Sequence, residues 1–433
     1  MNIQDYLTPQ NWSKKDLRQL KDSLTTQAQN ELDSFLPLAS SDYNNNPIQV
    51  IDFFCGAGGT SLGFAAVNKI VPAFKFLGGC DINNISASSY SKNFGTKKIN
   101  RDIVELAYVE GELEKVLTEI GYNNAMPTVL IGCAPCQGFT SHRKRYWTEE
   151  DDGRNTLILA FAEIVKKISP DAIVMENVPE FLSKKYWQYF STAKTKYESY
   201  GYTVKQSIYN AASFGVPQER FRTVVIGMKH NFVMPSGHLS PQEYRSVKDA
   251  IGMLLPLKSG EKDPNDPMHV AIAHKTSTLE VIKSVPHDGG SRPSGIGPAC
   301  LDKVRGFYDV YGRLSWDRPS ITITAFARNP ASGRFTHPDQ DRVITAREAA
   351  TLQSFPRGFE FTGGSCDVFR QIGEAVPPKM STSIAADVLI ELISCEPNSD
   401  EISKEVTIIT DPVSSSYSSV IAGIKMRQKG MKR

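Results

Sequence analysis

The chain has 433 residues, of which 40% are hydrophobic and 22% are charged. This composition excludes a chain that is disordered throughout, because it provides enough apolar material for a core, and the length predicts two or three domains. The formal net charge is only +2. The total charge therefore favours no nucleic-acid partner, and any evidence for one must be local.

Three features of the sequence bear on the compartment. No apolar run reaches the ~18–20 residues of a transmembrane helix, and the first residues lack the apolar stretch of a signal peptide. The seven cysteines are scattered and odd in number, which argues against a disulfide framework. We therefore expect a cytoplasmic protein with reduced thiols and no membrane partner.

Residues 1–48 are interpreted as an N-terminal extension, because leucines recur there at helical spacing. From Gln49 onward, short apolar runs alternate with helical patterns. Strands are predicted at 49–54, 74–81, 128–133, 171–177 and 222–228, and helices at 85–94 and 156–168. This alternation predicts a doubly wound, mainly parallel α/β sheet over residues 49–228.

The alternation ends after Met228. Residues 229–342 are rich in Gly and Pro and have few periodic runs, which indicates a second, smaller and loop-rich domain. Helical patterns return at 346–353 and 380–392. We expect residues 343–395 to complete the first domain and residues 396–433 to form a C-terminal tail, disordered from Asp411.

A glycine-rich turn follows the first predicted strand, in the sequence Phe54-Cys-Gly56-Ala-Gly58-Gly59. Glycines at such a turn let the backbone approach a ligand and expose the amides of a helix N-terminus. The third glycine of a dinucleotide fingerprint is replaced by Ser61, so the fingerprint is incomplete. Taken alone, the glycines have helix packing as an alternative explanation.

Two carboxylates strengthen the case for a nucleoside site. Asp81 ends the second predicted strand, where it can accept hydrogen bonds from the hydroxyls of a ribose. Asp102, with Ile103, falls near the expected end of a third strand, in a place suited to an adenine pocket. Glycines and carboxylates together favour a nucleoside ligand over packing alone.

A second turn, GCAPCQGFT at 132–140, follows a buried strand and presents Cys136 at the edge of the sheet where ligands bind. The pair Cys133 and Cys136 lacks a second pair to complete a metal site, and the chain lacks a thioredoxin pattern. For Cys133, the alternative interpretation is a structural role in the core. Cys136 remains a candidate nucleophile, activated by nearby positive charge. Residues 142–145 (His-Arg-Lys-Arg) supply that charge and suit phosphate contact, with a solvated loop as the alternative.

Glu176 ends another buried strand, where a carboxylate is costly unless it is paired or functional. Arg220 and Arg222 flank the start of the strand at 222–228, with side chains on one face, although ordinary surface charge is an alternative for them. A thiol, a carboxylate and a cation could thus converge on one pocket. Such a set suits addition of a thiolate to an electron-poor ring.

The chain resembles the cytosine-5 DNA methyltransferases over residues 49–395. Ten sequence blocks follow the order found in that family: DFFCGAGGTSLGF, GCDINN, RDI, GCAPCQGFT, RNTL, ENV, QERFR, RLSWDRPSITIT, HPDQDRVITAREAATLQSFP and QIGEAVPP. The resemblance implies a Rossmann-like methyltransferase domain, and it identifies residues 229–342 as a target-recognition domain.

The resemblance also implies the roles of the catalytic residues. Cys136 would attack carbon 6 of cytosine, Glu176 would hold and protonate ring nitrogen 3, and Arg222 would bind the carbonyl oxygen of the base. Arg220 would support the site. The cytosine must be flipped out of the duplex for this chemistry, and residues 139–154 would close over the DNA.

The methyl donor implied by the resemblance is S-adenosylmethionine, with no metal. Its site would comprise Phe54, Gly56, Gly58, Gly59, Asp81, Ile82, Asp102, Ile103, Leu157, Glu374 and Val376. The family commonly has Asn where this chain has Glu374, and often Glu where it has Asp81. A carboxylate at position 374 either pairs with the amino group of the donor or weakens donor binding.

The expected function is methylation of carbon 5 of cytosine in a specific double-stranded DNA sequence, by a monomer at the prokaryotic nucleoid. A restriction endonuclease is an expected functional partner. The alternatives are a non-catalytic DNA-binding module and an RNA cytosine methyltransferase of the same fold. Candidates for contacts to phosphate or guanine, each with plain surface charge as its alternative, are Arg245, Lys248, Arg292, Arg305 and Arg313.

Overall fold

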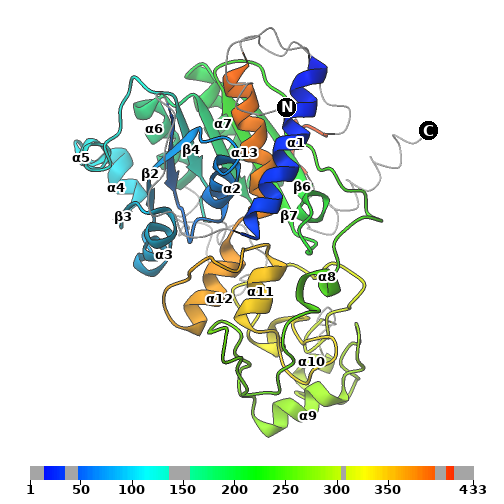
Figure 1. Cartoon of the computed structure of the whole chain (residues 1–433). Helices are drawn as coiled ribbons and strands as arrows, with labels where there is room; N and C mark the ends of the chain where they lie inside the picture. Colours follow the sequence, from blue (N-terminus) through cyan, green and yellow to red (C-terminus); the bar gives the residue numbers. More distant parts are fainter. Residues whose placement is uncertain (1–13, 35–46, 136–156, 304–308, 395–405, 414–433) are drawn as a thin grey trace.

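The structure, a computed structural model, describes residues 14–34, 47–135, 157–303, 309–394 and 406–413. Figure 1 shows two lobes, an upper one built around a sheet and a lower one of short helices and loops. Within the described residues, no helix combines the length and apolar character needed to cross a membrane.

The upper lobe contains one seven-stranded sheet with the order β3-β2-β1-β4-β5-β7-β6. The strands are β1 (Ile48–Phe53), β2 (Phe74–Cys80), β3 (Lys97–Ile99), β4 (Thr128–Gly132), β5 (Ala172–Asn177), β6 (Thr203–Asn210) and β7 (Phe221–Met228). The first five are parallel, whereas β7 runs antiparallel to both β5 and β6. The predicted doubly wound, mainly parallel sheet is confirmed, and β6 is an addition that the apolar pattern did not indicate.

Helices cover both faces of the sheet. Successive strand residues point to opposite faces, and apolar side chains on both faces must be buried. In β4, Val129 and Ile131 belong to one buried apolar cluster and Leu130 to the other. The first cluster includes residues of α2 (Gly59–Asn68) and α13 (Pro378–Ile393). The second includes residues of α4 (Ile103–Tyr108), α5 (Glu112–Glu119), α6 (Leu157–Ile168) and α7 (Trp187–Ser199).

The N-terminal extension contains α1 (Lys14–Leu32), which packs on α13 and α2 (Figure 1). Leu24, Ala28 and Leu32 are buried there. Lys21 pairs with the buried Asp387 of α13 at 2.5 Å. The helical pattern predicted for this segment is confirmed, and the helix serves as a packing element of the upper lobe.

The described residues of the lower lobe contain short helices and isolated bridges in place of a sheet. The helices are α8 (Val247–Ile251), α9 (Thr276–Ser284), α10 (Cys300–Lys303), α11 (Ala346–Leu352) and α12 (Ser365–Glu374). Figure 1 shows α11 and α12 in the part of this lobe that is nearest to the upper lobe, whereas α13 returns to the sheet. The loop-rich character predicted from residue 229 onward is confirmed.

Buried arginines organise the interior of the lower lobe. Arg313 is fully buried and donates hydrogen bonds to four backbone carbonyls, those of residues 282, 285, 337 and 340. The expectation that Arg313 reads DNA is therefore wrong, because its guanidinium is satisfied inside the protein. Arg292 is also largely buried and pairs with Asp302 at 2.8 Å, whereas Arg245 and Lys248 are exposed and Arg305 lies outside the described residues.

Part of the C-terminal tail lies along the edge of the sheet. The Ile409 N–H donates to the Gln206 carbonyl of β6 at 3.0 Å, and the Val413 N–H donates to the Leu182 carbonyl at 2.9 Å. Residues 406–413 thereby cover an edge strand, which would otherwise expose unpaired backbone groups. The expected disorder from Asp411 is wrong for residues 411–413, and the rest of the tail lies outside the described residues.

Candidate active site

The glycine-rich turn that follows β1 has a backbone conformation that residues with a side chain rarely adopt. Phe54, Gly56 and Gly58 all have positive φ angles, of 57°, 54° and 99°. A Cβ placed on Gly56 would meet nothing within 4 Å, whereas one on Gly59 would lie 2.4 Å from the Val376 carbonyl oxygen. The turn is thus open on the side of Gly56 and closed by backbone on the side of Gly59, which brings Val376 to the predicted donor site.

Asp81 connects this turn to the next helix. Its carboxylate accepts hydrogen bonds from the Gly56 N–H at 2.9 Å and from the Asn83 N–H at 2.7 Å. Burial raises the pKa of Asp81, and these two hydrogen bonds oppose the rise. Each carboxylate oxygen has a second lone pair, so both can still accept a hydroxyl of a ligand.

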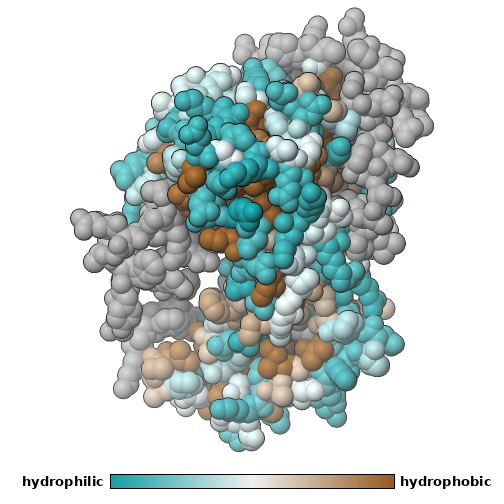
Figure 2. All heavy atoms as spheres, turned by 90° about the vertical axis from the view of Figure 1, so that its left-hand side faces the viewer, coloured by the Kyte–Doolittle hydropathy of each residue, from teal (hydrophilic) through white to brown (hydrophobic). Residues whose placement is uncertain are grey.

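Neighbouring predicted donor residues lie on the same side of the sheet. The Ile82 side chain, just after Asp81, is 71% exposed, while Ile103 is buried. Asp102 follows β3 by three residues and caps α4, accepting a hydrogen bond from the Val104 N–H at 2.8 Å. Figure 2, which views the molecule from the left-hand side of Figure 1, shows hydrophobic residues as separate patches among hydrophilic ones.

The other predicted donor residues come from α6 and from the end of α12. Leu157 is half-buried at the start of α6. Glu374 is the exposed last residue of α12, and Val376 is buried two residues later. The contact between Val376 and Gly59 places the end of α12 beside the glycine turn.

Asp52 is a functional candidate that the sequence reasoning missed. It is buried in β1 under the glycine turn and accepts a hydrogen bond from the Ser61 hydroxyl at 2.7 Å. The Ser61 hydroxyl also lies 3.0 Å from that of Tyr90. Burial raises the pKa of Asp52 to about 7, despite the hydrogen bond from Ser61. Its signal in the sequence was a carboxylate in a strand whose other residues, apart from Gln49, are apolar.

Glu176 and Arg222 form an ion pair at the end of β5. Arg222 lies near the start of the antiparallel neighbour β7, and its Nε is 2.7 Å from the Glu176 Oε1. Both side chains are only slightly exposed. Burial raises the pKa of Glu176, while Arg222 and Arg220 oppose the rise. The net effect favours a carboxyl group that retains its proton at higher pH than an ordinary glutamate.

Cys133, at the end of β4, has the environment of an inert thiol. Its Sγ lies 3.3 Å from the Thr60 hydroxyl. Burial, followed by the nearby Glu176, raises the pKa of the Cys133 thiol well above its usual value. No cluster of His, Cys, Asp and Glu suited to a metal occurs in the part of the chain that the structure describes.

Cys136, the basic residues 142–145 and the loop 139–154 lie outside the described residues. The described part of the cysteine turn ends at residue 135, beside the Glu176 strand. There the Asn177 side chain donates a hydrogen bond to the Ala134 carbonyl at 3.3 Å. The turn that leads to Cys136 is therefore tied to the residue that follows Glu176.

The two arginines of the QERFR block have different partners. Whereas Arg222 contacts Glu176, the buried guanidinium of Arg220 donates to the carbonyls of Ile323, Gly373 and Ala375 at 2.9–3.0 Å. Arg220 thus fastens the lower lobe and the end of α12 to the start of β7. The supporting role at the base site that the resemblance implies for Arg220 stays a prediction.

Comparisons with known proteins agree with this arrangement. The model of the C-5 cytosine-specific DNA methylase family matches residues 48–389. The type II methylase M.HgiDII of Herpetosiphon aurantiacus is 36% identical over 351 residues, which cover 78% of this chain and 94% of the relative. The type II methyltransferase M1.HphI of Haemophilus parahaemolyticus is also 36% identical, over 78% of this chain and 86% of the relative.

A solved structure shares the fold. A DNA modification methyltransferase described as encoded within an E. coli prophage superposes with a TM-score of 0.58 at 23% identity, covering 80% of this chain and 99% of the other. The seven-stranded sheet is thus of the Rossmann-like methyltransferase type. The chain belongs to the C-5 cytosine-specific DNA methylase family and is a DNA cytosine-5-methyltransferase.

Proposed function

We propose that the chain uses S-adenosylmethionine to methylate one cytosine of a specific duplex sequence, as the modification enzyme of a prokaryotic restriction–modification system. The observation that carries the proposal is the buried Glu176–Arg222 pair, joined through Asn177 to the turn that leads to Cys136. The type II relatives support the biological setting. In this setting the enzyme acts as a cytoplasmic monomer, and the endonuclease is a functional partner.

The Glu176–Arg222 pair suits the activation of a cytosine ring. A carboxyl group with a raised pKa can hold a proton against ring nitrogen 3, which makes carbon 6 more electrophilic. Arg222, fixed at 2.7 Å from Glu176, can donate a hydrogen bond to the neighbouring carbonyl oxygen of the base. The contact between the two side chains thus positions the Glu176 carboxyl group and the Arg222 guanidinium before the base binds.

In the proposed sequence, the thiolate of Cys136 forms a bond to carbon 6 while nitrogen 3 takes the proton from Glu176. The electron pair of the carbon 5–carbon 6 double bond then becomes available at carbon 5. After carbon 5 has gained the methyl group, it loses its proton to solvent, the bond between sulfur and carbon 6 breaks, and the ring double bond returns. Nitrogen 3 gives its proton back to Glu176 in the same step. Cys136 and Glu176 end as they began.

The glycine turn fits the methyl donor. S-adenosylmethionine would supply an activated methyl group on its sulfonium sulfur. The open space at Gly56 leaves room for its methionine portion, and Asp81 can accept the ribose hydroxyls. The exposed Ile82 side chain offers an apolar surface to the adenine. Phe54, Gly58, Gly59, Asp102, Ile103, Leu157 and Val376 complete the proposed site.

A methyl-transfer assay with labelled donor tests the proposal directly. Cys136→Ser should abolish transfer to duplex DNA while DNA binding persists, and Cys133→Ser is the matched control that should retain activity. A duplex with 5-fluorocytosine at the target should trap a covalent adduct through Cys136. Absence of transfer by the unaltered chain on every duplex would contradict the proposal, and preferential transfer to tRNA would favour the RNA alternative.

Glu176→Gln tests the role of the carboxyl group. Glutamine keeps the size but cannot transfer a proton, so kcat should fall by about 10²–10⁴. The affinity for DNA should change little. An unchanged kcat would contradict the assignment of Glu176.

Glu374→Asn tests the residue that departs from the family pattern. We propose that the Glu374 carboxylate pairs with the amino group of the donor, so the substitution should weaken S-adenosylmethionine binding by about three- to tenfold. Calorimetric titration of the donor measures this change. Equal or tighter binding would show that the carboxylate is a handicap.

A further inference from the structure

Phe326 is a phenylalanine whose side chain is 67% exposed, the highest exposed fraction of any Phe among the described residues. It lies in the loop that follows the RPSITIT block. A single exposed apolar residue is common on protein surfaces, so exposure alone identifies no site. The position of Phe326 relative to the base site and the way its loop is held provide the argument.

The loop is tied to the QERFR segment. The Ile323 carbonyl accepts the hydrogen bond from Arg220 at 3.0 Å, and the Ile323 N–H donates to the Gln218 side chain at 2.9 Å. A Cβ on Gly373 would lie 2.2 Å from the backbone of residues 324 and 325, so the end of α12 packs directly on the loop. Arg220, which is close to the Glu176–Arg222 pair, therefore holds the loop at Ile323. Phe326 follows three residues later.

Internal hydrogen bonds hold the backbone of Phe326 in place. The Asn329 N–H and the Ser332 hydroxyl both donate to the Phe326 carbonyl, at 2.9 and 2.6 Å. The next residue, Ala327, is fully buried and anchors the turn. The loop thus presents the Phe326 side chain to solvent on a held backbone, which lowers the entropy cost of binding through it.

The surroundings of Phe326 in the sequence carry positive charge. Residues 318–338 contain three arginines and no aspartate or glutamate. Arg318 and Arg328 are exposed, whereas Arg334 pairs with Asp309 at 2.9 Å. An exposed aromatic ring with an exposed arginine two residues away, here Arg328, is a combination suited to binding unstacked bases beside phosphates.

We propose that Phe326 contacts the target site of duplex DNA and packs against the bases that lose a stacking partner when the cytosine leaves the helix. The inference rests on the proposed function, since it requires a flipped base. An apolar side chain in this role lowers the cost of unstacking, as wedge residues do in proteins that distort DNA. Phe326 is thus a DNA-contacting residue that favours the flipped state and takes no part in bond making.

The experiment compares Phe326→Ala with the unaltered enzyme on two duplexes. In one the target cytosine is paired with guanine, and in the other it faces an abasic site, where it is already poorly stacked. Phe326→Ala should lower kcat/KM for the paired duplex by about tenfold, the size of one lost stacking contact. The deficit should shrink on the abasic duplex. Met253→Ala, which removes a 99% exposed side chain elsewhere in the lower lobe, should stay within about twofold of the unaltered enzyme on both.

The flipped state can also be followed directly. With 2-aminopurine at the target position, Phe326→Ala should show a smaller fluorescence increase on binding than the unaltered enzyme. Full activity of Phe326→Ala on the paired duplex, or an equal deficit on both duplexes, would overturn the inference. If Phe326→Ala does not fold, Phe326→Leu provides the same comparison. Failure of the unaltered enzyme on every duplex would instead contradict the proposed function.

Discussion

In the upper lobe, β1, β4 and β5 pair their backbone N–H and C=O groups with one another, and the side chains between sheet and helices are apolar. In the lower lobe, backbone carbonyls from residues 282–340 accept their hydrogen bonds from the buried guanidinium of Arg313. Buried carbonyls need donors wherever a sheet or helix does not supply them. An arginine supplies five, which suits an interior made of loops.

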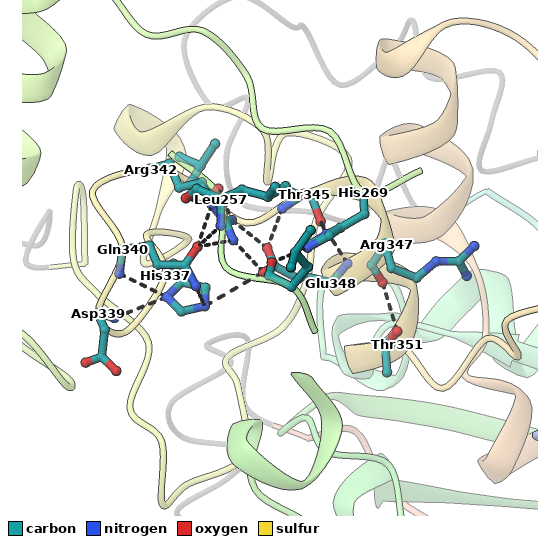
Figure 3. A network of polar contacts seen from close by, with 12 residues as sticks. Leu257, His269, His337, Asp339, Gln340, Arg342, Thr345, Arg347, Glu348 and Thr351 are labelled. Carbon is teal, nitrogen blue, oxygen red and sulfur yellow. Dashed lines mark hydrogen bonds and ion pairs between the residues drawn. The ribbon is translucent and has the colours of Figure 1, made fainter. Parts of the chain in front are cut away.

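The same difference appears around Glu348 (Figure 3). Its carboxylate accepts two hydrogen bonds from the buried Arg342, at 2.7 and 2.8 Å, and a third from the Thr345 N–H at 2.7 Å. His337 lies 3.7 Å away and is also buried. The interior of the lower lobe therefore contains fully buried paired charges among its apolar residues, whereas apolar packing dominates both faces of the sheet in the upper lobe.

The largest effect is expected from breaking this pairing. Glu348→Ala leaves Arg342 as an uncompensated buried charge, which should lower the free energy of unfolding by about 3–5 kcal/mol. Urea denaturation measures the loss. Glu114→Ala, at an exposed carboxylate of α5, is the control and should leave the midpoint nearly unchanged. A small loss for Glu348→Ala would mean that the lower lobe does not depend on its ion pairs.

A second prediction concerns the pH dependence of stability, because burial lowers the pKa of a histidine in one lobe and raises the pKa of an aspartate in the other. In the lower lobe, burial depresses the pKa of His337 to about 4. The unfolded chain then binds the proton more readily, so this contribution is complete above pH 6.5 and is lost as the pH falls toward 4. In the upper lobe, burial raises the pKa of Asp52 to about 7. Its contribution is complete below pH 3.8 and is lost as the pH rises through 7.

Lowering the pH from 7 to 5 should therefore weaken the lower lobe by about 2 kcal/mol through His337 and strengthen the upper lobe by about 2 kcal/mol through Asp52. Hydrogen exchange of each lobe, corrected for the intrinsic rate at each pH, measures both changes. The amide of Ile344, bonded to the Phe335 carbonyl, reports on the lower lobe, and the amides of β1 on the upper. His337→Asn should reduce the pH dependence of stability only in the lower lobe, and Asp52→Asn should reduce it only in the upper lobe. If both lobes became more stable, or both less stable, between pH 7 and pH 5, the proposed difference between the lobes would be contradicted.

The sequence predicted the upper lobe better than the lower one, for a physical reason. Apolar residues at fixed spacing, such as those of β4 and β5, indicate a sheet because burial follows periodicity. The ion pair between Glu176 and Arg222 agrees with the prediction that a strand-end carboxylate meets a cation. Where a polar residue was buried, the pattern was uninformative: Ser61 was noted only as a missing glycine, although its hydroxyl holds Asp52.

The lower lobe shows more clearly that sequence patterns do not predict which polar residues are buried. Arg313 was interpreted as surface charge or a DNA contact because arginines are mostly exposed, and its carbonyl partners lie up to 31 residues away in the sequence. β6 was missed because three consecutive polar residues, Lys205, Gln206 and Ser207, interrupt its apolar residues. Residues 406–413 gain their order from the edge of β6, which no local pattern in the tail indicates.

The smallest effect is expected from an apolar change in the upper lobe. Ile131→Val removes one buried methylene from β4, where neighbouring strands fix the backbone. The loss should be about 1 kcal/mol in urea denaturation, and it should be the same at pH 5 and pH 7, because no charge is unpaired. This independence of pH is what separates an apolar interior from one held by ion pairs. A loss for Ile131→Val that grows at either pH would show that packing around β4 is coupled to the titration of Asp52.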